Sequence, residues 1–306
     1  MAESPGTEAR VEVDGRTLSL SNLGKVLYPG DGTTKGEVLH YYAQIAPVLL
    51  PHLKDRAVTR IRWPNGTAGS SFFEKNVPSG APDWLHTAEV PTTGSRGESR
   101  HGDRIVFPVI DSLAELTYLA NLASLELHVH QWRVDADGQP LDPDRMVIDL
   151  DPGHPAGLHE CARVALLVRD RLADLGLGAA PVTSGSKGLH LYAPMPGTLT
   201  ADQVREAAKQ IAEDLEKKHP ALVVSQMTKA KRPGKVLLDW SQNTGSKTTI
   251  SPYSLRGKDR PYAAAPRTWD EIEAGAEEPG ELSHLTYTEV LARVAEHGDL
   301  FGSQLS

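Results

Sequence analysis

Three aspartates stand in apolar stretches that have the pattern of β-strands. In Arg-Met-Val-Ile-Asp-Leu-Asp-Pro-Gly, residues 145–153, strand side chains alternate between two faces, so Asp149 and Asp151 share one face. Asp239 stands alone in a second apolar run, Lys-Val-Leu-Leu-Asp-Trp. Three carboxylates within about 5 Å of one another would repel by roughly 3 kcal/mol per pair at an effective dielectric constant near 20, and burial adds to that. Such a group requires cations.

The donor type indicates which cations. Carboxylate oxygens with no cysteine nearby favour Mn²⁺ or Mg²⁺, and a pair of such ions suits phosphoryl or nucleotidyl transfer. The alternative is that Asp151-Pro152-Gly153 is an ordinary turn, because an isolated Asp-x-Asp is often structural. An aspartate in the middle of Met-Val-Ile-Asp-Leu favours the metal interpretation. We therefore expect two ions on Asp149, Asp151 and Asp239.

Two small polar loops accompany the acidic strands. Residues 184–188, Ser-Gly-Ser-Lys-Gly, offer backbone amides, a hydroxyl and the Lys187 ammonium, and they lead into a strand that presents His190. Such a loop can hold phosphates, although each loop alone could be a generic turn. A similar loop, residues 243–248, follows Asp239. The chain has neither a P-loop nor a complete dinucleotide fingerprint, since Gly176-Leu177-Gly178 lacks the third glycine.

Histidines and aromatic residues add two further candidates. His128 and His130 alternate on one strand face and fit either a metal site or a hydrogen-bonded pair. Basic and aromatic side chains are interleaved nearby, a pattern that suits stacking on nucleic-acid bases. This interleaved set is Arg56, Arg60, Arg62, Trp63, Phe72, Phe73 and Lys75. Adjacent strand residues face opposite ways, so at least one of the two phenylalanines should be exposed.

The elements that position these residues follow from apolar periodicity and from turn and capping residues. The pattern predicts helices at 34–53, 111–125, 159–175 and from Thr200 to before Pro220, a hairpin at 57–74, and strands at 145–150, 189–193, 222–227 and 236–240. Residues 92–103 read as an exposed, mobile loop and the first residues as an untethered tail. The order β-α-β-α-β-β in the second half predicts a sheet covered on one side by two helices.

Composition limits the class of protein. The 306 residues are 39% hydrophobic and 24% charged, with one cysteine, Cys161, and without an apolar run long enough to cross a bilayer. We therefore expect a soluble cytoplasmic protein without an internal disulfide, a Cys-rich zinc site or a membrane partner. The net charge is −8, but residues 225–260 hold eight basic against two acidic residues, whereas 261–306 hold two against nine. The body can thus present a basic surface to a polyanion.

In combination, these motifs resemble the polymerase domain of bacterial ligase D, the end-joining member of the archaeo-eukaryotic primase superfamily. The resemblance runs from about Leu18 to Leu300. The segments that carry it are SNLGKVLYP, YYAQIAPVLLPHL, RWPNG, FFEK, LELHVHQW, IDLDPG, TSGSKGLHLY, MTKAKRPGKVLLDWSQN, KTTISPYSLRG and AAPRTW. It implies template-directed nucleotide addition at short gaps and double-strand breaks, dependence on Mn²⁺, and a preference for ribonucleotides over deoxyribonucleotides.

The resemblance also assigns residues. Asp149, Asp151 and Asp239 would bind the metals. The nucleoside triphosphate would contact Ser184, Ser186, Lys187, His190, His128, Gln242 and Arg256. The 5′-phosphate of the downstream DNA strand would bind to Asn22, Lys25 and Lys35, and the template and primer would contact Phe72, Phe73, Arg62, Lys75 and Arg232. Two departures stand out: Ile61 replaces a basic residue of many relatives, and the 92–103 loop is longer than usual.

The fold expected from these observations is α+β, an RRM-like primase-polymerase core of mixed sheets flanked by helices, with an N-terminal α/β module. We expect a disordered tail at 1–16 and one catalytic unit at 17–300, made of a module at about 17–140, a core at about 141–260 and an acidic helical segment at 261–306. The alternative functions are a two-metal nuclease or phosphatase and a non-catalytic module that binds DNA ends. A ligase is excluded because Lys-x-Asp-Gly is missing, so sealing would need a DNA ligase and an end-binding protein such as Ku as partners.

Overall fold

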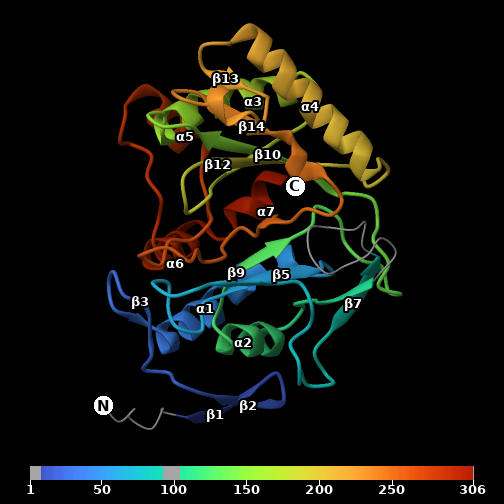
Figure 1. The fold of residues 1–306 in the computed structure, drawn as a ribbon, viewed down its shortest axis with the longest axis vertical. Coiled ribbons are helices and arrows are strands. Elements are labelled where there is room, and N and C mark those ends of the chain that lie inside the picture. The colour runs from blue at the N-terminus through green and yellow to red at the C-terminus, as the bar shows by residue number, and fades with distance from the viewer. Residues whose placement is uncertain (1–7, 92–103, 306) are drawn as a thin grey trace.

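Two β-sheets, each covered by helices, make up most of the molecule (Figure 1). The computed structural model describes residues 8–91 and 104–305. The larger sheet has the order β13 (Val223–Val224), β14 (Val236–Asp239), β10 (Arg145–Pro152), β12 (Leu189–Pro194), β11 (Ala180–Thr183) and β16 (Ala265–Pro266). The smaller sheet has the order β15 (Thr249–Ile250), β9 (Ser124–Val129), β5 (Val58–Arg62) and β6 (Phe72–Glu74). The expected α+β class is confirmed.

Strand β10 separates two hydrophobic cores, as its alternating sequence predicts. Met146, Ile148 and Leu150 are buried in a core with residues of α3 (Leu158–Ala173) and α4 (Ala201–Lys218). Val147, on the other face, belongs to the core between the two sheets. Both helices lie on one side of the larger sheet (Figure 1), so the predicted arrangement is confirmed. The prediction missed β11, whose four residues are all buried and therefore show no alternation.

The smaller sheet carries α1 (Lys35–Leu53) and α2 (Leu113–Asn121) on its outer side (Figure 1). Helix α1 begins where the sequence predicts, because Thr34 and Glu37 form a capping box. The predicted hairpin is confirmed as β5 and β6, which pair antiparallel. Strand β6 is an edge strand.

Three small hairpins complete the strands. They are β1 (Ala9–Val13) with β2 (Arg16–Leu20), β3 (Val26–Tyr28) with β4 (Thr33–Thr34), and β7 (Thr87–Pro91) with β8 (Arg104–Pro108). The first corrects the expected disordered tail at 1–16: Asp14 and Gly15 turn the chain at positive φ, and Leu18 and Leu20 are buried in the hydrophobic core that also contains residues of α1 and α2. Residues 1–7 and the predicted 92–103 loop lie outside the described residues.

Several predicted boundaries were wrong. The helix expected to reach residue 125 ends at Asn121, because Ala123 takes positive φ and Ser124 begins β9. Helix α3 ends at Ala173, which leaves Leu175 exposed. The strand expected at 222–227 shrinks to Val223–Val224. In the two helices a residue at positive φ, Ala123 or Gly176, and not the apolar pattern, marks the end.

The part of the chain expected to be an acidic helical segment, 261–306, contains α5 (Trp269–Glu277), α6 (Tyr287–His297) and α7 (Leu300–Leu305). This part of the chain also completes the larger sheet, since β16 pairs with β11, and α7 buries Phe301 in the core between the sheets. The division into a module, a core and a helical segment stays a prediction. In the described residues we find no helix with the length and apolar character that crossing a membrane requires.

An ion pair with a buried arginine joins the start of β5 in the smaller sheet to the start of β10 in the larger one. Arg56, which precedes β5 and is 1% exposed, donates from Nη2 to both carboxylate oxygens of Asp144, at 2.7 and 2.6 Å. Asp144 precedes β10 and also accepts from Arg133. Burial lowers the pKa of Arg56 to about 9, and Asp144 opposes that shift. Arg56 is therefore a structural residue, which corrects its expected place on a nucleic-acid surface.

We predict that Asp144→Ala destabilises the fold by about 3 kcal/mol, because it leaves a buried guanidinium without its counter-charge. The matched control is Glu273→Ala, which removes the exposed partner of Arg169 (Nη1 to Oε1 2.7 Å) and should cost less than about 1 kcal/mol. Urea unfolding measures both. Similar, small losses in the two variants would show that the buried pair contributes little.

Candidate active site

The register of the larger sheet brings the three acids together. Asp149 on β10 stands directly opposite Asp239 on β14 and opposite His190 on β12. Residues opposite each other in an antiparallel pair share a face, and Asp151 follows Asp149 on that face. All three carboxylates therefore lie on the side of the sheet away from α3 and α4.

The charges in this group are not balanced by the protein. Burial, followed by the Asp149 carboxylate, raises the pKa of Asp151 to about 6; Asp239 adds to the effect, while His190 and Arg232 oppose it. The nearest basic atom to Asp149 is Nε2 of His190, 3.3 Å from Oδ1. The remaining excess of negative charge favours binding of a cation.

The donor set fits a metal that is shared with a substrate. Among the residues that the structure describes, no group of three or more His, Cys, Asp or Glu side chains is arranged to hold a metal ion by itself. Mg²⁺ is usually bound by one or two carboxylates together with waters and substrate phosphates, and not by a complete protein cage. Asp149 and Asp239, opposite each other, match that requirement.

Asp239 is held in place by its own loop. Its Oδ1 accepts from the backbone N–H (2.9 Å) and the hydroxyl of Ser241, and its Oδ2 accepts from Nε2 of Gln242 (3.2 Å). Lys247, from the second Gly-Ser-Lys loop, donates to Oγ of Ser241. The loop that the sequence places after Asp239 thus orients this carboxylate.

A cavity of about 210 Å³ lies against the acids, between the two sheets. Its lining is His128, Asp149, Asp151, Ser184, Ser186, Lys187, Gly188, His190, Gln242, Thr248, Thr249, Ile250 and Arg256. Every residue predicted to contact a nucleotide is in this set, and so are two of the three predicted metal ligands. The structure therefore brings them together, while their individual roles stay predictions.

The loop 184–188 is closed by a side chain of its own. Oγ of Ser184 accepts from the backbone N–H groups of Ser186, Lys187 and Gly188 at 3.2–3.3 Å. Gly188 must be glycine, because a Cβ there would overlap the carbonyl oxygen of Leu150 on β10. This close approach sets the Lys187 backbone beside the acidic strand.

Glu126 on β9 belongs to the site and was missed. It is buried, its Oε2 lies 2.8 Å from Nε2 of His128 and 3.5 Å from Nη1 of Arg256, and its Oε1 accepts from the N–H of Gly257. These partners lower the pKa of Glu126 against the opposing effect of burial. Glu126 therefore fixes two cavity side chains. A charged residue inside Leu-Glu-Leu-His-Val was the signal that could have found it. Thr248, Thr249 and Ile250 carried no such signal.

His128 on β9 and His130, just after its end, differ in role. His128 lines the cavity and bonds Glu126, whereas His130 is buried outside it, with Nδ1 3.2 Å from the carbonyl oxygen of Ala57. Both are hydrogen-bonded within the protein. Of the two interpretations of these histidines, a metal site or a hydrogen-bonded pair, this geometry fits the second.

A second positive site lies near the start of α1. The backbone N–H of Lys35 donates to the carbonyl oxygen of Lys25, and the backbone N–H of Lys25 donates to the carbonyl oxygen of Asn22. Nζ of Lys35 donates to the carbonyl of Ser21 (2.6 Å), and Nζ of Lys25 to Oδ1 of Asn65 (3.1 Å). Burial and the Lys25 charge lower the pKa of Lys35 to about 8. In the described chain neither lysine has a carboxylate partner within ion-pair distance, so the pair suits an anion.

The predicted template residues are exposed on the edge strand. Phe72 and Phe73 are 52% and 62% exposed, so both are free to stack, although the sequence required only one to be exposed. The neighbouring basic residues differ from expectation: Arg60 is buried and paired with Glu74, and Arg62 donates to Glu74 and to the carbonyl of Leu122. Arg60 is thus structural, which corrects its place in the stacking surface.

Three other predicted positions lie apart from the cavity lining. Ile61 packs partly buried against the core between the sheets. Lys75 lines two other hollows. Arg232 ends the 3-10 turn Lys229–Lys231, and its carbonyl lies so close to Gly153 that a side chain there would overlap it. This contact seats the basic loop beside the acidic strand.

The chain is similar to known proteins. The chain matches the family model described as LigD, primase-polymerase domain, over residues 34–301. It is 48% identical over 288 residues to the multifunctional non-homologous end joining DNA repair protein LigD of Mycobacterium tuberculosis, covering 92% of this chain and 36% of that protein. It is 47% identical over 301 residues to LigD of Mycolicibacterium smegmatis, covering 98% of this chain and 37% of that protein. It is 32% identical over 258 residues to LigD of Bacillus subtilis, covering 84% of this chain and 40% of that protein.

A solved structure agrees with the sequence matches. The polymerase domain of Mycobacterium tuberculosis ligase D in complex with DNA superposes with a TM-score of 0.86 at 46% identity, covering 94% of this chain and 97% of that one. The chain spans two fifths or less of the curated relatives it matches. It belongs to the primase-polymerase domain family of ligase D.

Proposed function

We propose that the chain adds nucleotides, under direction of a template, to the 3′ end of a DNA primer at short gaps and broken ends. One observation carries this proposal: a single cavity has carboxylates on one strand and the cations Lys187 and Arg256 on facing loops. A nucleoside triphosphate needs both, because its phosphates require positive charge and the reacting phosphate requires metal ions. A nuclease would have no use for the triphosphate part of the cavity.

Asp149, Asp151 and Asp239 are the residues that would hold two ions, Mn²⁺ or Mg²⁺. When bound, such ions neutralise phosphate charge and polarise the primer 3′ oxygen. The chain itself orients its ligands: Ser241 and Gln242 fix Asp239, and the sheet register fixes Asp149.

The nucleotide would lie between the two sheets. The Lys187 ammonium suits the phosphates, with Arg256 beside the same loop and Ser184 in the same lining. His128, His190 and Gln242 complete the lining, and Glu126 holds both His128 and Arg256. Several of these contacts would thus come from side chains that the fold already holds in place.

The DNA would lie across the smaller sheet. Phe72 and Phe73 offer exposed faces for template bases, with Arg62 and Lys75 beside them, and Arg232 is placed near the acids for primer or nucleotide. The pair Lys25 and Lys35, with Asn22, suits a terminal 5′-phosphate. A gapped duplex could then be held at both sides of the gap.

The relatives are multifunctional or bifunctional proteins by name, and this chain spans only 36–40% of their length. We propose a DNA ligase, for nick sealing, and an end-binding protein such as Ku, for recognition of broken ends, as its partners in the bacterial cytoplasm. We also propose that ribonucleotides are preferred over deoxyribonucleotides.

We predict that Asp149→Ala, Asp151→Ala and Asp239→Ala each lower the rate of nucleotide addition by at least about 100-fold, because they remove the ligands that position charge at the reacting phosphate. DNA affinity should change little, since basic residues supply it. Primer extension on gapped DNA with Mn²⁺ measures the first effect, and fluorescence anisotropy the second. The control is Asp174→Ala, an exposed acid at the end of α3. Normal extension by any of the three variants would refute the metal assignment.

We predict that a 5′-phosphate at the gap strengthens DNA binding roughly tenfold, through charge-assisted hydrogen bonds to Lys25 and Lys35. The double variant Lys25→Ala/Lys35→Ala should bind both DNAs equally, whereas the exposed Lys54→Ala should keep the preference. The preference should also shrink between pH 7 and pH 9, because Lys35, with its pKa lowered to about 8, loses its charge there. A preference that survives the double variant would place the phosphate elsewhere.

We predict that ribonucleotides are incorporated roughly tenfold more efficiently than deoxyribonucleotides, since a site that bonds a hydroxyl penalises its absence. Ser184→Ala should lower that ratio. Oγ of Ser184 also closes the loop 184–188, so the variant can loosen that loop. A loosened loop would lower kcat/KM for ribonucleotides and deoxyribonucleotides alike. The readout is therefore the ratio of kcat/KM for ribonucleotides to kcat/KM for deoxyribonucleotides. Equal efficiencies in the wild type would refute the preference, and an unchanged ratio in Ser184→Ala would remove Ser184 from the role.

A further inference from the structure

Tyr192 is a buried residue of β12 that none of the roles above uses. Its side chain is 1% exposed and packs in the core that also contains Ile250 of the smaller sheet. It lies on the same face of β12 as His190, which stands two positions earlier. That face carries the acids, since His190 stands opposite Asp149. Tyr192 is therefore the buried neighbour of a residue that lines the cavity beside the acids.

The Tyr192 hydroxyl joins the larger sheet to the smaller one. Its oxygen lies 3.1 Å from the carbonyl oxygen of Ile250 on β15 and 3.3 Å from Nδ1 of His190. A carbonyl oxygen only accepts, so the single hydroxyl hydrogen goes to Ile250, and the hydroxyl oxygen accepts from Nδ1–H of His190. Burial raises the pKa of the Tyr192 hydroxyl, so it keeps this hydrogen. A contact that spans both sheets thus sets the hydrogen on Nδ1 of His190.

The ring of Tyr192 is packed against two buried side chains. The guanidinium of Arg145 lies over it, with Cζ 5.5 Å from the ring centroid, and the ring of Phe301 in α7 meets it edge-on, with the centroids 5.1 Å apart. Arg145 is itself held, since its Nε donates to Oε1 of Gln131 at 3.0 Å. The Tyr192 hydroxyl is therefore a fixed point that orients the ring of His190.

The other ring nitrogen of His190 faces the acids. Nε2 lies 3.3 Å from Oδ1 of Asp149, and both residues line the same cavity. The hydrogen bond at one nitrogen of a histidine decides how the other nitrogen is presented. With Nδ1 bonded to Tyr192, Nε2 is directed at Asp149. A half-turn of the ring about χ2 would replace Nε2 by the carbon Cε1, and the contact with Tyr192 opposes that turn.

We propose that Tyr192 is a positioning residue for nucleotide addition: its hydroxyl, anchored on Ile250 of the opposite sheet, holds the His190 ring so that Nε2 faces Asp149 and the incoming nucleotide. The inference rests on the proposed function, because it assumes that the cavity binds a nucleoside triphosphate. Ile250 also pairs with His128 of β9. The same hydroxyl therefore places the two histidines of the cavity lining relative to each other.

The first test compares Tyr192→Phe, which removes only the hydroxyl, with Tyr41→Phe. Tyr41 is as deeply buried, and its hydroxyl donates to the carbonyl oxygen of Tyr253 at 2.6 Å, outside the cavity lining. Urea unfolding should show similar losses of stability, since each variant leaves one buried carbonyl without its donor. In primer extension on gapped DNA with Mn²⁺, kcat/KM for a ribonucleotide should fall at least about tenfold in Tyr192→Phe and less than about twofold in Tyr41→Phe.

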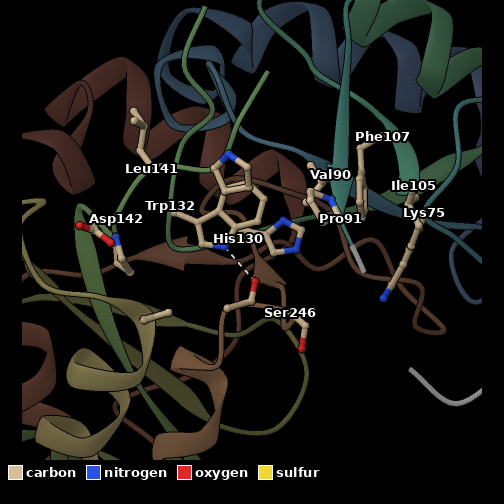
Figure 2. A pocket seen from close by; sticks show the side chains of 14 residues that line it. Lys75, Val90, Pro91, Ile105, Phe107, His130, Trp132, Leu141, Asp142 and Ser246 are labelled. Carbon is tan, nitrogen blue, oxygen red and sulfur yellow. Dashed lines mark hydrogen bonds between the residues drawn. The ribbon is translucent and has the colours of Figure 1, made fainter. Parts of the chain in front are cut away.

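The second test observes the His190 ring directly and needs neither DNA nor nucleotide. In the full chain labelled with ¹⁵N-histidine, NMR of the wild type should show a slowly exchanging Nδ1–H of His190, identified by its absence in His190→Ala. His130 is the internal reference, because its ring is buried against Trp132 with centroids 4.1 Å apart (Figure 2) and its Nδ1 lies 3.2 Å from the carbonyl oxygen of Ala57. Tyr192→Phe should remove the His190 signal and keep the His130 signal.

Three results would each overturn the proposal. They are an unchanged kcat/KM in Tyr192→Phe, a protected Nδ1–H of His190 that is missing from the wild type, and one that persists in Tyr192→Phe. Persistence of the signal together with a loss of activity would mean that the hydroxyl acts on the packing of the sheets and not on His190. Absence of nucleotide addition by the wild type would instead contradict the proposed function, and the NMR signal would still decide whether Tyr192 orients the ring.

Discussion

Repulsion between carboxylates is the constraint on which this structure depends. The antiparallel register of β10 and β14 holds Asp149 opposite Asp239, and the alternation of β10 adds Asp151 to the same face. Burial and the carboxylates of Asp149 and Asp239 raise the pKa of Asp151 to about 6, although His190 and Arg232 oppose that shift. The fold tolerates this group because the other face of the strand is packed into the core with α3 and α4. The imbalance remains available for metal ions and the phosphates they carry.

The positive half of the site comes from elsewhere in the fold. Lys187 arrives on a loop closed by Ser184, and Arg256 is held by Glu126 from the smaller sheet. The cavity beside the acids therefore exists only because the two sheets pack against each other, with α7 burying Phe301 in the core between them. This dependence explains why the ion pair between Arg56 and Asp144, remote from the cavity, matters to it: the pair fixes the module that carries β9 against the strand that carries the acids.

Local patterns predicted much of this arrangement. Strand alternation placed Asp149 and Asp151 on one face, capping residues placed the starts of α1 and α4, and the Gly-Ser-Lys loops proved to border the cavity and to orient Asp239. What escaped prediction depends on partners distant in sequence. Arg60 appeared to belong to a basic surface, yet it is buried against Glu74. Glu126 forms an ion pair with Arg256, which lies 130 positions away in the chain, and accepts from the N–H of Gly257. The sequence of β11 shows no alternation of apolar and polar residues, because this strand is buried on both faces.

The most direct test of this account is a crystal structure with gapped DNA, Mn²⁺ and a non-hydrolysable ribonucleoside triphosphate, in which anomalous scattering locates the manganese. The account predicts manganese between Asp149 and Asp239, with the triphosphate on Lys187 and Arg256. Manganese bound away from these carboxylates, or a triphosphate outside the cavity between the two sheets, would contradict it.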